Sequence, residues 1–352
     1  MHATFTDALS ADDVKREAAA IGFDLCGIAP AGALPELAFL REWLDRGYAG
    51  EMHYLERTAE RRDDVRHVLP SARSVIVLGS VYNVDRPYST ENPARSRAAI
   101  ARYAWGDDYH VIIGKKLSRL LTWLRERAGP AFEGRAYVDT GPVQERVYAQ
   151  HAGLGWIGKN TCVINPSMGS WIFLSEIICN LTLEPDAPAL DQCGTCTLCL
   201  EACPTGALVD EHVLDSTRCL SYLTIELKGP IPVEHRSAIA EHAYGCDLCQ
   251  EVCPWNAHPA VSAATEWQPR SGLDGPTLLQ LWQHTDEELR MLLKESAMKR
   301  AGITRLRRNL AVAIGNCGDP STIETLSARH APSCADPLVD EHVRWAAEKL
   351  GG

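Results

Sequence analysis

The sequence predicts an α+β protein of several domains, with an α/β domain at residues 1–184, a cysteine-rich domain at residues 185–268 and a helical segment at residues 269–352. Three observations support this division. The chain has 352 residues, which is more than a single core of ordinary size requires. Eight of its 13 cysteines lie between residues 193 and 253. A proline-rich stretch, Leu183-Glu-Pro-Asp-Ala-Pro188, comes before them and interrupts regular structure.

The first domain combines helical and strand patterns. Apolar residues recur at intervals of three and four over residues 11–21, 34–46 and 109–127, as they do in amphipathic helices. Two short apolar runs bounded by polar or turn residues, Ser74–Leu78 and Trp171–Leu174, are typical of strands. The mixture of the two patterns indicates an α/β domain.

The cysteine-rich domain has little room for long helices or strands, because cysteine, glycine and proline recur throughout it. Domains of this kind replace a hydrophobic core with metal centres, so we expect metal binding to fold this one. The last segment returns to a helical period at residues 278–282, 287–293, 303–314, 321–328 and 339–350. Within it, Ala311–Asn316 followed by Asp319 and Pro320 resembles a HEAT-type helical repeat.

The composition argues against several classes of protein. The chain has 45% hydrophobic and 23% charged residues and no run of 18 apolar residues that would span a membrane. Residues 1–13 lack the basic and apolar regions of a secretory signal, so we expect a cytoplasmic protein. A formal net charge of −11 disfavours binding of nucleic acid by the whole surface but does not exclude a local basic patch.

The clustered cysteines are spaced as iron–sulfur ligands, and in a reducing compartment such clustering indicates metal binding rather than disulfides. The first run consists of Cys193, Cys196, Cys199 and Cys203, followed by Pro204. This is the bacterial ferredoxin spacing, in which three cysteines bind one 4Fe-4S cluster and the fourth reaches another. The second run, which lacks one member of that pattern, consists of Cys246, Cys249 and Cys253. Cys219 is the nearest cysteine that can complete it.

The ferredoxin rule also predicts how the eight thiolates divide between two clusters. One cluster takes Cys193, Cys196, Cys199 and Cys253. The other takes Cys203, Cys219, Cys246 and Cys249. A pair of structural zinc sites would also use paired cysteines, but zinc does not call for two Cys-x3-Cys-Pro ends that exchange ligands. We expect the five isolated cysteines to be small buried hydrophobic residues: Cys26, Cys162, Cys179, Cys317 and Cys334.

The segment Ala152–Asn160 contains three glycines, Gly153, Gly155 and Gly158, which would allow the backbone to approach a large ligand closely. Their spacing formally fits a dinucleotide-binding motif, but no clean strand precedes them and no acidic residue follows at the required distance. The segment also mimics a phosphate-binding loop, but Asn160 stands where a magnesium-binding Ser or Thr is needed. Both assignments are therefore disfavoured.

Far more protein surrounds the cysteines than an electron carrier requires, so a further ligand is expected. Four segments together resemble the epoxyqueuosine reductase family, namely Tyr137–Arg146, Ala152–Lys159, Cys219–Glu226 and Gly245–Asn256. The resemblance spans most of the chain. It implies a cobalamin-dependent enzyme with two 4Fe-4S clusters that reduces epoxyqueuosine to queuosine at the wobble position of tRNA, the last step of queuosine biosynthesis. Residues 1–184 would then bind cobalamin, and residues 185–268 would form the ferredoxin-like domain.

The resemblance places the catalytic aspartate at Asp139, directly after the strand-like Ala136–Val138. Removing an epoxide oxygen as water takes two electrons and two protons, and we expect Asp139 to donate a proton. A carboxyl group can do so at neutral pH only if burial or a nearby negative charge raises its pKa well above the usual value of about 4. The alternative is an aspartate that caps the turn beginning at Thr140.

The resemblance also assigns residues to the pocket. The substrate-binding candidates are Tyr103, Tyr109 and His110. The cobalamin-binding candidates are Arg57, Asp139, Trp156, Lys159, Asn160, Ser170 and Ser221. Taken without the resemblance, His110 would be a surface or capping residue and Arg57 a solvated helix charge. The sequence has no Asp-x-His-x-x-Gly motif to place an imidazole on cobalt, so we expect a cofactor bound without a protein histidine.

A basic stretch lies in the helical segment, with six Lys or Arg residues and one acidic residue, Glu295, between residues 294 and 308. We expect it to bind the tRNA backbone, because phosphate contacts position an RNA while its unpaired bases are read elsewhere. The tRNA-binding candidates are Tyr222, Lys299, Arg300, Arg305, Arg307 and Arg308. Trp255 and Asn256 could face the anticodon loop as well. The alternative is a solvated basic helix face.

Two other functions fit part of the pattern. A reductive dehalogenase resembles this class in pairing cobalamin with two clusters, but such enzymes usually carry a twin-arginine export signal, and none is seen in this sequence. A two-cluster electron carrier, or a non-catalytic RNA-binding module with clusters, would not retain cobalamin. The enzyme interpretation further requires an external electron donor, and nothing in the sequence indicates more than a monomer.

Overall fold

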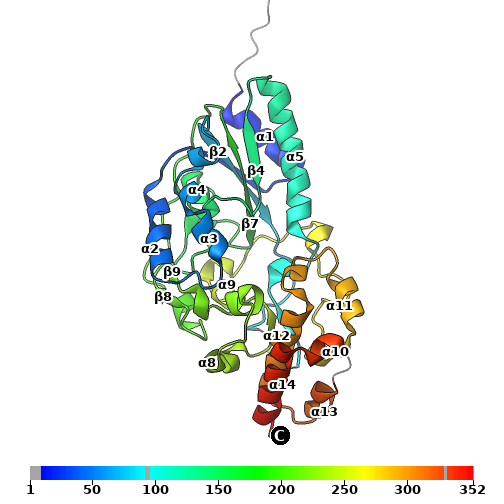
Figure 1. Ribbon diagram of the computed structural model, residues 1–352. Helices are drawn as coiled ribbons and strands as arrows, with labels where there is room; N and C mark the ends of the chain where they lie inside the picture. Colours follow the sequence, from blue (N-terminus) through cyan, green and yellow to red (C-terminus); the bar gives the residue numbers. More distant parts are fainter. Residues whose placement is uncertain (1–8, 92–95, 329–330, 352) are drawn as a thin grey trace, which may run out of the picture.

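A computed structural model describes residues 9–91, 96–328 and 331–351; the first eight residues, on which part of the export-signal expectation rests, lie outside them. Figure 1 shows the sheet and its helices in the upper part of the molecule, and the cysteine-rich region and the C-terminal helices side by side in the lower part. Within the described ranges, no helix combines the length and the apolar character that crossing a membrane would need.

Four strands form the central sheet in the order β1-β2-β7-β4. In that order they cover Leu25–Pro30, Ser74–Val81, Ile172–Cys179 and Gly134–Tyr137. Every residue of β2 is buried, because this strand lies inside the sheet with side chains packed on both faces. All neighbouring strands run antiparallel. The domain is therefore α+β, and the α/β expectation is wrong because a buried apolar strand does not reveal its partner's direction.

Helices cover both faces of the sheet. α1 (Ala11–Ile21) and α5 (Tyr109–Ala128) pack on the face that presents Ile76 and Leu78. The opposite face, which presents Val75 and Val77, is covered by α6 (Glu145–His151). Figure 1 shows the short helices α2 (Phe39–Asp45), α3 (His53–Arg57) and α4 (Ala59–Asp63) on the other side of the sheet from α1 and α5. The helices predicted at residues 11–21 and 109–127 are confirmed, whereas residues 34–46 divide into a 3-10 turn, Pro35–Ala38, and α2.

The cysteine-rich region consists of short elements, as expected. They are α7 (Leu198–Glu201), β8 (Leu208–Asp210), β9 (Val213–Leu214), α8 (Val233–Arg236), β10 (His242–Tyr244) and α9 (Leu248–Glu251). A π-helical turn, Tyr222–Glu226, follows Cys219 closely. β10 pairs in parallel with β3 (Ala99–Ile100), so this region is joined to the first domain through hydrogen bonds. A second small pairing, β5 (Trp156–Ile157) with β6 (Val163–Ile164), lies in the first domain.

The helices of the last segment agree with the sequence pattern. They are α10 (Leu278–Gln283), α11 (Asp286–Leu293), α12 (Gly302–Cys317), α13 (Thr322–Ser327) and α14 (Pro337–Lys349). α12 is central to this segment, since ten consecutive residues of it, Leu306–Gly315, are buried. The HEAT-type repeat stays a prediction.

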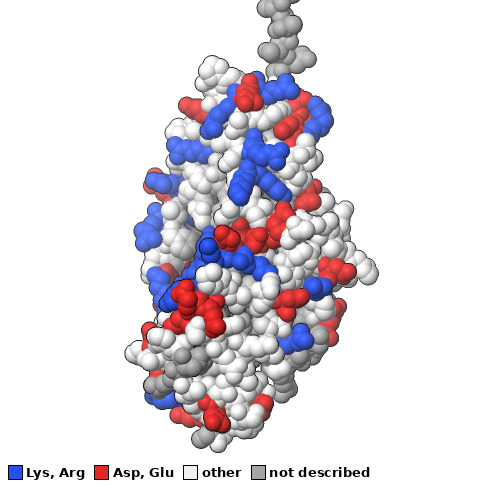
Figure 2. Space-filling view, turned by 90° about the vertical axis from the view of Figure 1, so that its right-hand side faces the viewer, with Lys and Arg blue, Asp and Glu red and all other residues white. Residues whose placement is uncertain are grey.

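The central position of α12 overturns part of the predicted basic patch. Arg307 and Arg308 are completely buried, and Arg305 is directed to the backbone oxygens of Arg300, Ala301 and Ile225. Arg308 donates to the carbonyl oxygens of Leu223, Leu227 and Gly229. Arg305 and Arg308 therefore tie the helical segment to the cysteine-rich region, and Arg307 and Arg308 cannot form an exposed surface, whereas Arg305 stays partly exposed. On the face shown in Figure 2, Lys and Arg side chains gather mainly over the upper part of the molecule.

Candidate active site

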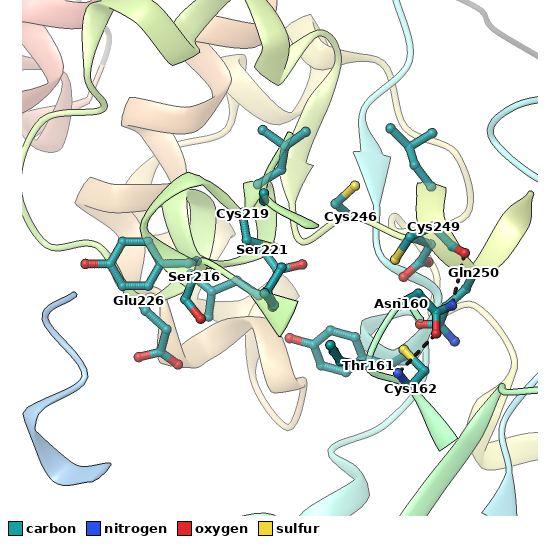
Figure 3. A pocket seen from close by; sticks show the side chains of 18 of the residues that line it. Asn160, Thr161, Cys162, Ser216, Cys219, Ser221, Glu226, Cys246, Cys249 and Gln250 are labelled. Atoms are coloured by element: carbon teal, nitrogen blue, oxygen red, sulfur yellow. Dashed lines mark hydrogen bonds between the residues drawn. The ribbon is translucent and has the colours of Figure 1, made fainter. Parts of the chain in front are cut away.

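A cleft of about 490 Å³ lies where the sheet domain, the cysteine-rich region and the C-terminal segment meet. Asp139, Tyr109 and Phe173 line it from the sheet domain, and Arg300 lines it from the C-terminal segment. The cysteine-rich region contributes four cysteines to its wall: Cys203, Cys219, Cys246 and Cys249. Figure 3 shows three of them, Cys219, Cys246 and Cys249, around one end of the cleft, with Asn160 and Cys162 beside Cys249.

The other four cysteines of the two runs surround a separate small cavity: Cys193, Cys196, Cys199 and Cys253. The division predicted by the ferredoxin rule is therefore the division in which the cysteines lie. Burial raises the pKa of the Cys199 thiol to about 11, and it also raises the pKa of the Cys246 thiol. Neutral thiols must lose their protons to bind a metal, so metal binding by these cysteines is coupled to proton release. It is also coupled to the ordering of the loops that carry them. In the described ranges, no three His, Cys, Asp or Glu side chains converge as a site for one metal ion would require.

The isolated cysteines do not all behave as small hydrophobic residues. Cys179 and Cys334 are buried, as expected, and Cys26 and Cys317 are partly buried. Cys162 is different, because its thiol is hydrogen-bonded to the thiol of Cys249. This bond lowers the pKa of Cys162. No sequence pattern predicts this contact, since residue 162 lies 87 positions before Cys249.

The glycines of Ala152–Asn160 serve the protein's own packing. A side chain at Gly155 would approach the backbone oxygen of Ile164 to 2.3 Å, and one at Gly158 would approach the side chain of Ile164 to 2.4 Å. Gly153 has a left-handed backbone with φ +71°. The expectation that these glycines bring backbone close to a large ligand is therefore wrong at Gly155 and Gly158, where the close neighbour is the paired strand β6.

Two of the predicted cobalamin contacts lie beside the small cavity. The indole Nε1–H of Trp156 donates to Cys193 Sγ at 3.4 Å. Lys159 donates to the carbonyl oxygen of Gly194 at 2.8 Å and pairs with Glu211 at 2.7 Å. Both side chains are buried. In these positions they contact the loop of the first cysteine run rather than line the large cleft.

The remaining predicted cobalamin contacts divide between the cleft and its surroundings. Asn160 and Ser221 line the cleft with Asp139, and the Asn160 side chain also donates to the carbonyl oxygen of Cys249. Ser170 is buried behind the cleft wall, where it accepts hydrogen bonds from Gln250 and Asn256. Arg57 is exposed at the end of α3 and is not part of the cleft wall.

Asp139 lies at the centre of a polar array in the cleft. Its Oδ2 accepts hydrogen bonds from the Tyr109 hydroxyl at 2.9 Å and from His110 Nε2 at 3.1 Å. Arg300 lies 3.4 Å from the same oxygen. Tyr109 and His110 begin α5, whose N-cap is Asp108, and Arg300 ends the 3-10 turn before α12. Segments more than 150 residues apart are thus brought to one carboxylate oxygen.

His110 lies between two carboxylates. Its Nδ1 is 2.8 Å from Asp108 Oδ1, and its Nε2 faces Asp139. Both ring nitrogens can donate at once only if the imidazole carries two protons. Lys299 contacts the other oxygen of Asp108 at 2.9 Å. Tyr103 completes this side of the cleft, where its ring packs edge-on to that of Tyr109.

The charge state of Asp139 in the polypeptide alone follows from its contacts. Loss of water raises its pKa, but the hydrogen bonds from His110 and Tyr109 and the charge of Arg300 outweigh that effect, so its pKa is below the usual range. In the polypeptide alone, Asp139 is therefore a carboxylate, and a raised pKa stays a prediction for the protein with cobalamin stacked over the site. Its backbone N–H donates to Oε1 of Glu145 at 2.7 Å, and no sequence pattern had pointed to Glu145.

Arg300, a member of the predicted tRNA-binding set, lines the cleft, and Lys299 lies next to it on Asp108; both side chains are partly exposed. Tyr222 also lines the cleft but is largely buried, and its hydroxyl accepts the backbone N–H of Glu51. Asn256 is completely buried against Ser170, so it cannot face an anticodon loop. Trp255 packs edge-on to Trp156 near the first cysteine run.

Comparison with known proteins agrees with this geometry. Residues 192–256 match a family model described as a 4Fe-4S double cluster binding domain, and residues 62–140 match one described as Epoxyqueuosine reductase QueG. The first match contains all eight cysteines of the two sets. The second ends directly after Asp139.

The chain is also similar to whole proteins. It is 45% identical over 322 residues to the epoxyqueuosine reductase of Gloeobacter violaceus, covering 89% of this chain and 98% of that protein. A crystal structure of epoxyqueuosine reductase with an epoxyqueuosine-modified tRNA-Tyr stem loop is 32% identical, with a TM-score of 0.87, covering 97% and 90% of the two chains. A structure of the Bacillus subtilis enzyme with its catalytic aspartate loop swung out of the active site is 30% identical, with a TM-score of 0.85 and the same coverage.

Proposed function

The chain belongs to the epoxyqueuosine reductase family, and we propose that its cleft reduces epoxyqueuosine to queuosine in tRNA with Asp139 as the proton donor. The single observation that carries this assignment is the convergence of Tyr109, His110 and Arg300 on one oxygen of Asp139 inside a cleft whose wall contains four cluster cysteines. Electrons and protons can therefore be delivered to the same space.

Two 4Fe-4S clusters fit the two cysteine sets, because each set offers four thiols around one cavity. Cobalamin fits the large cleft, which combines apolar side chains such as Phe173 and Leu220 with the amides of Asn160 and Gln250. His110 is the one histidine among the described residues of the cleft wall, and two carboxylates already occupy its nitrogens. This supports a corrin held without an imidazole on cobalt. When bound, the clusters and cobalamin supply the two electrons.

The protons come from the array around Asp139. His110, held between Asp108 and Asp139, can return a proton to Asp139 Oδ2 after the carboxyl has given one to the departing epoxide oxygen. Arg300 makes the longest of the three contacts with that oxygen. An RNA phosphate that draws Arg300 away would raise the pKa of Asp139 and so favour the protonated carboxyl. Substrate binding would in this way prepare the acid.

The exposed cations at the cleft position the RNA. Lys299 and Arg300 are the members of the basic stretch that keep part of their side chains in solvent while lying next to the catalytic array. Phosphate contacts of this kind orient an RNA without reading its sequence. The protein then acts on the tRNA in the cytoplasm as a monomer and receives electrons from an external donor.

The test is turnover by the protein reconstituted anaerobically with iron, sulfide and cobalamin. With a strong reductant it should convert epoxyqueuosine in tRNA to queuosine, as measured by mass spectrometry of nucleosides. Asp139→Asn should keep the absorption of clusters and corrin but lose at least about 100-fold in rate, the contribution typical of a positioned acid. Asp45→Asn, a change at an exposed aspartate, is the control. Normal turnover by Asp139→Asn would remove Asp139 from the proposed role.

A further inference from the structure

The Asp139 turn is strained and needs to be held in place. Asp139 has a left-handed backbone, with φ 59°, although it is not a glycine. The Thr140 N–H donates to the carbonyl oxygen of Val138 at 2.6 Å and so closes a three-residue turn around it. Backbone conformations of this kind persist only where the surroundings impose them. In the Bacillus subtilis relative, the catalytic aspartate loop is swung out of the active site.

Two side chains, Glu145 and Arg62, form hydrogen bonds with the backbone at and just after this turn. Glu145, the first residue of α6, accepts the backbone N–H of Asp139 at 2.7 Å. Arg62 donates to the carbonyl oxygens of Gly141 at 3.0 Å and Val143 at 2.7 Å. The Glu145 contact is the one that holds the left-handed residue itself. Its strength depends on the charge of the Glu145 carboxyl, because hydrogen bonds to an ionised acceptor are stronger than neutral ones.

Glu145, which is half-buried and lines the cleft, has a completely buried acid beside it. Glu176 projects from β7, is completely buried, and receives no hydrogen bond at either carboxyl oxygen from a donor in the described residues. Its carboxyl interacts electrostatically with that of Glu145, so the two acids lie close to each other. Two carboxyl groups can share a hydrogen bond only if one of them carries a proton. Burial raises the pKa of Glu176 well above its usual range, and it raises that of Glu145 to about 7.

Glu176 is the more deeply buried of the two, and a proton on its carboxyl can be donated to Glu145. Glu145 keeps its oxygens as acceptors, one for Glu176 and Oε1 for the Asp139 N–H. The other charged or titratable groups around the pair are Arg62, Arg146 and Asp139. A neutral Glu176 under a charged Glu145 avoids two adjacent buried charges, which would repel each other strongly.

We propose that Glu145 and Glu176 form a proton-sharing latch that holds the Asp139 turn in the cleft, so that two acids outside the reaction position the catalytic carboxyl. The inference deepens the proposed function and rests on it for the role of Asp139. Glu145 and Glu176 are positioning residues, since they act through the Asp139 backbone. The latch predicts that the turn opens when Glu145 can no longer accept the Asp139 N–H.

The test is hydrogen–deuterium exchange of the Asp139 and Thr140 amides in the protein loaded with clusters and cobalamin. Glu145→Ala should speed their exchange by about tenfold or more, which corresponds to loss of one charge-assisted hydrogen bond. It should lower kcat by a similar factor while KM for the tRNA changes less than about threefold, because the RNA contacts stay in place. Glu176→Gln, which keeps a donor beside a charged Glu145, should retain most of the protection and the rate, whereas Glu145→Gln, which keeps the acceptor without its charge, should fall between the wild type and Glu145→Ala.

Glu126→Ala, at an exposed position of α5, is the matched control. If Glu145→Ala fails to fold, as judged by cluster absorption, Glu145→Asp replaces it. The shorter side chain withdraws the carboxylate by one methylene, so amide exchange at Asp139 should be as fast as expected for Glu145→Ala. Unchanged exchange at Asp139 in either variant would overturn the latch, as would equal losses of rate in Glu145→Gln and Glu145→Ala. The exchange readout needs no turnover, so a wild-type protein inactive on epoxyqueuosine would overturn the proposed function and leave the latch to be judged by exchange alone.

Discussion

Replacing Arg307 by Met tests whether the basic residues of α12 stabilise the fold or bind RNA. The Arg307 guanidinium is completely buried and lies 3.2 Å from Asp286 Oδ1. It also donates to the carbonyl oxygens of Trp282 at 2.6 Å and His284 at 2.5 Å. Methionine fills a similar volume but replaces none of these hydrogen bonds. The substitution thus leaves a buried carboxylate without its cation.

Removing one partner of a buried ion pair usually costs about 3–5 kcal/mol, because the remaining charge is buried without compensation. We expect a loss of this size in the free energy of unfolding of the C-terminal helices. Arg290→Met is the matched control, since Arg290 is an exposed cation that pairs with Glu287 on the surface of α11. Exposed pairs contribute less than about 1 kcal/mol. Urea unfolding of the cluster-loaded proteins, followed by far-ultraviolet circular dichroism, measures both values.

The same two variants also test the alternative that Arg307 binds the phosphate backbone of the tRNA. A phosphate contact at Arg307 would weaken tRNA binding and leave stability almost unchanged, whereas the structure predicts the reverse. Binding of the tRNA at a temperature where both variants are folded should therefore equal that of the wild type. A loss of stability no larger than that of Arg290→Met, accompanied by weaker RNA binding, would refute the assignment of Arg307 to the core.

Three further outcomes are expected. Burial tends to raise the pKa of Asp286, but hydrogen bonds from Ser333 and Arg307 hold the pKa below its usual range. The charged Asp286 therefore stabilises the fold above the unfolded pKa of about 3.9, and this stabilisation is lost as pH falls through the lower folded pKa. The difference in unfolding free energy between wild type and Arg307→Met should accordingly shrink below about pH 4, as measured by unfolding at several pH values. Trp156→Phe removes the hydrogen bond to Cys193 Sγ and should lower the reduction potential of the cluster bound by Cys193, but not that of the other cluster. An electron paramagnetic resonance titration that finds both potentials unchanged would contradict this. Lys299→Met should weaken tRNA binding and reduce the slope of log K against log salt by about 0.7–0.9, whereas an unchanged slope would show that Lys299 contacts no phosphate.

The parts of the fold that could be predicted are those whose cause is local. Neighbouring residues determine the helical periods of α1 and α5, the apolar runs of β2 and β7 and the helices from Leu278 onward. The predictions for these elements therefore agree with the structure. The cysteine sets were also predictable, because metal ligation imposes a spacing on the chain. The direction of the strands was not, since antiparallel pairing of β2 with β7 is decided by connections that periodicity does not describe.

The misplaced arginines have a different cause. Charge alone assigns Arg307 and Arg308 to a surface, because an isolated buried cation is costly. That cost is offset here by partners far away in sequence, such as Asp286 for Arg307 and Leu223 for Arg308. The same kind of distant pairing governs Glu145 and Glu176, and Cys162 with Cys249. A sequence read without its contacts can identify such residues but not their roles.

The exchange of ligands between the two cysteine runs links the clusters to the shape of the cleft. Cys203, from the first run, lines the cleft with Cys246 and Cys249, whereas Cys253, from the second run, returns to the small cavity. Neither run can therefore hold a complete cluster without the other. Cys219 precedes the π-helical turn that places Tyr222 and Glu226 in the cleft wall, so the predicted ligation at Cys219 would also fix this part of the wall. Assembly of the clusters and formation of the catalytic cleft are, on this geometry, one event.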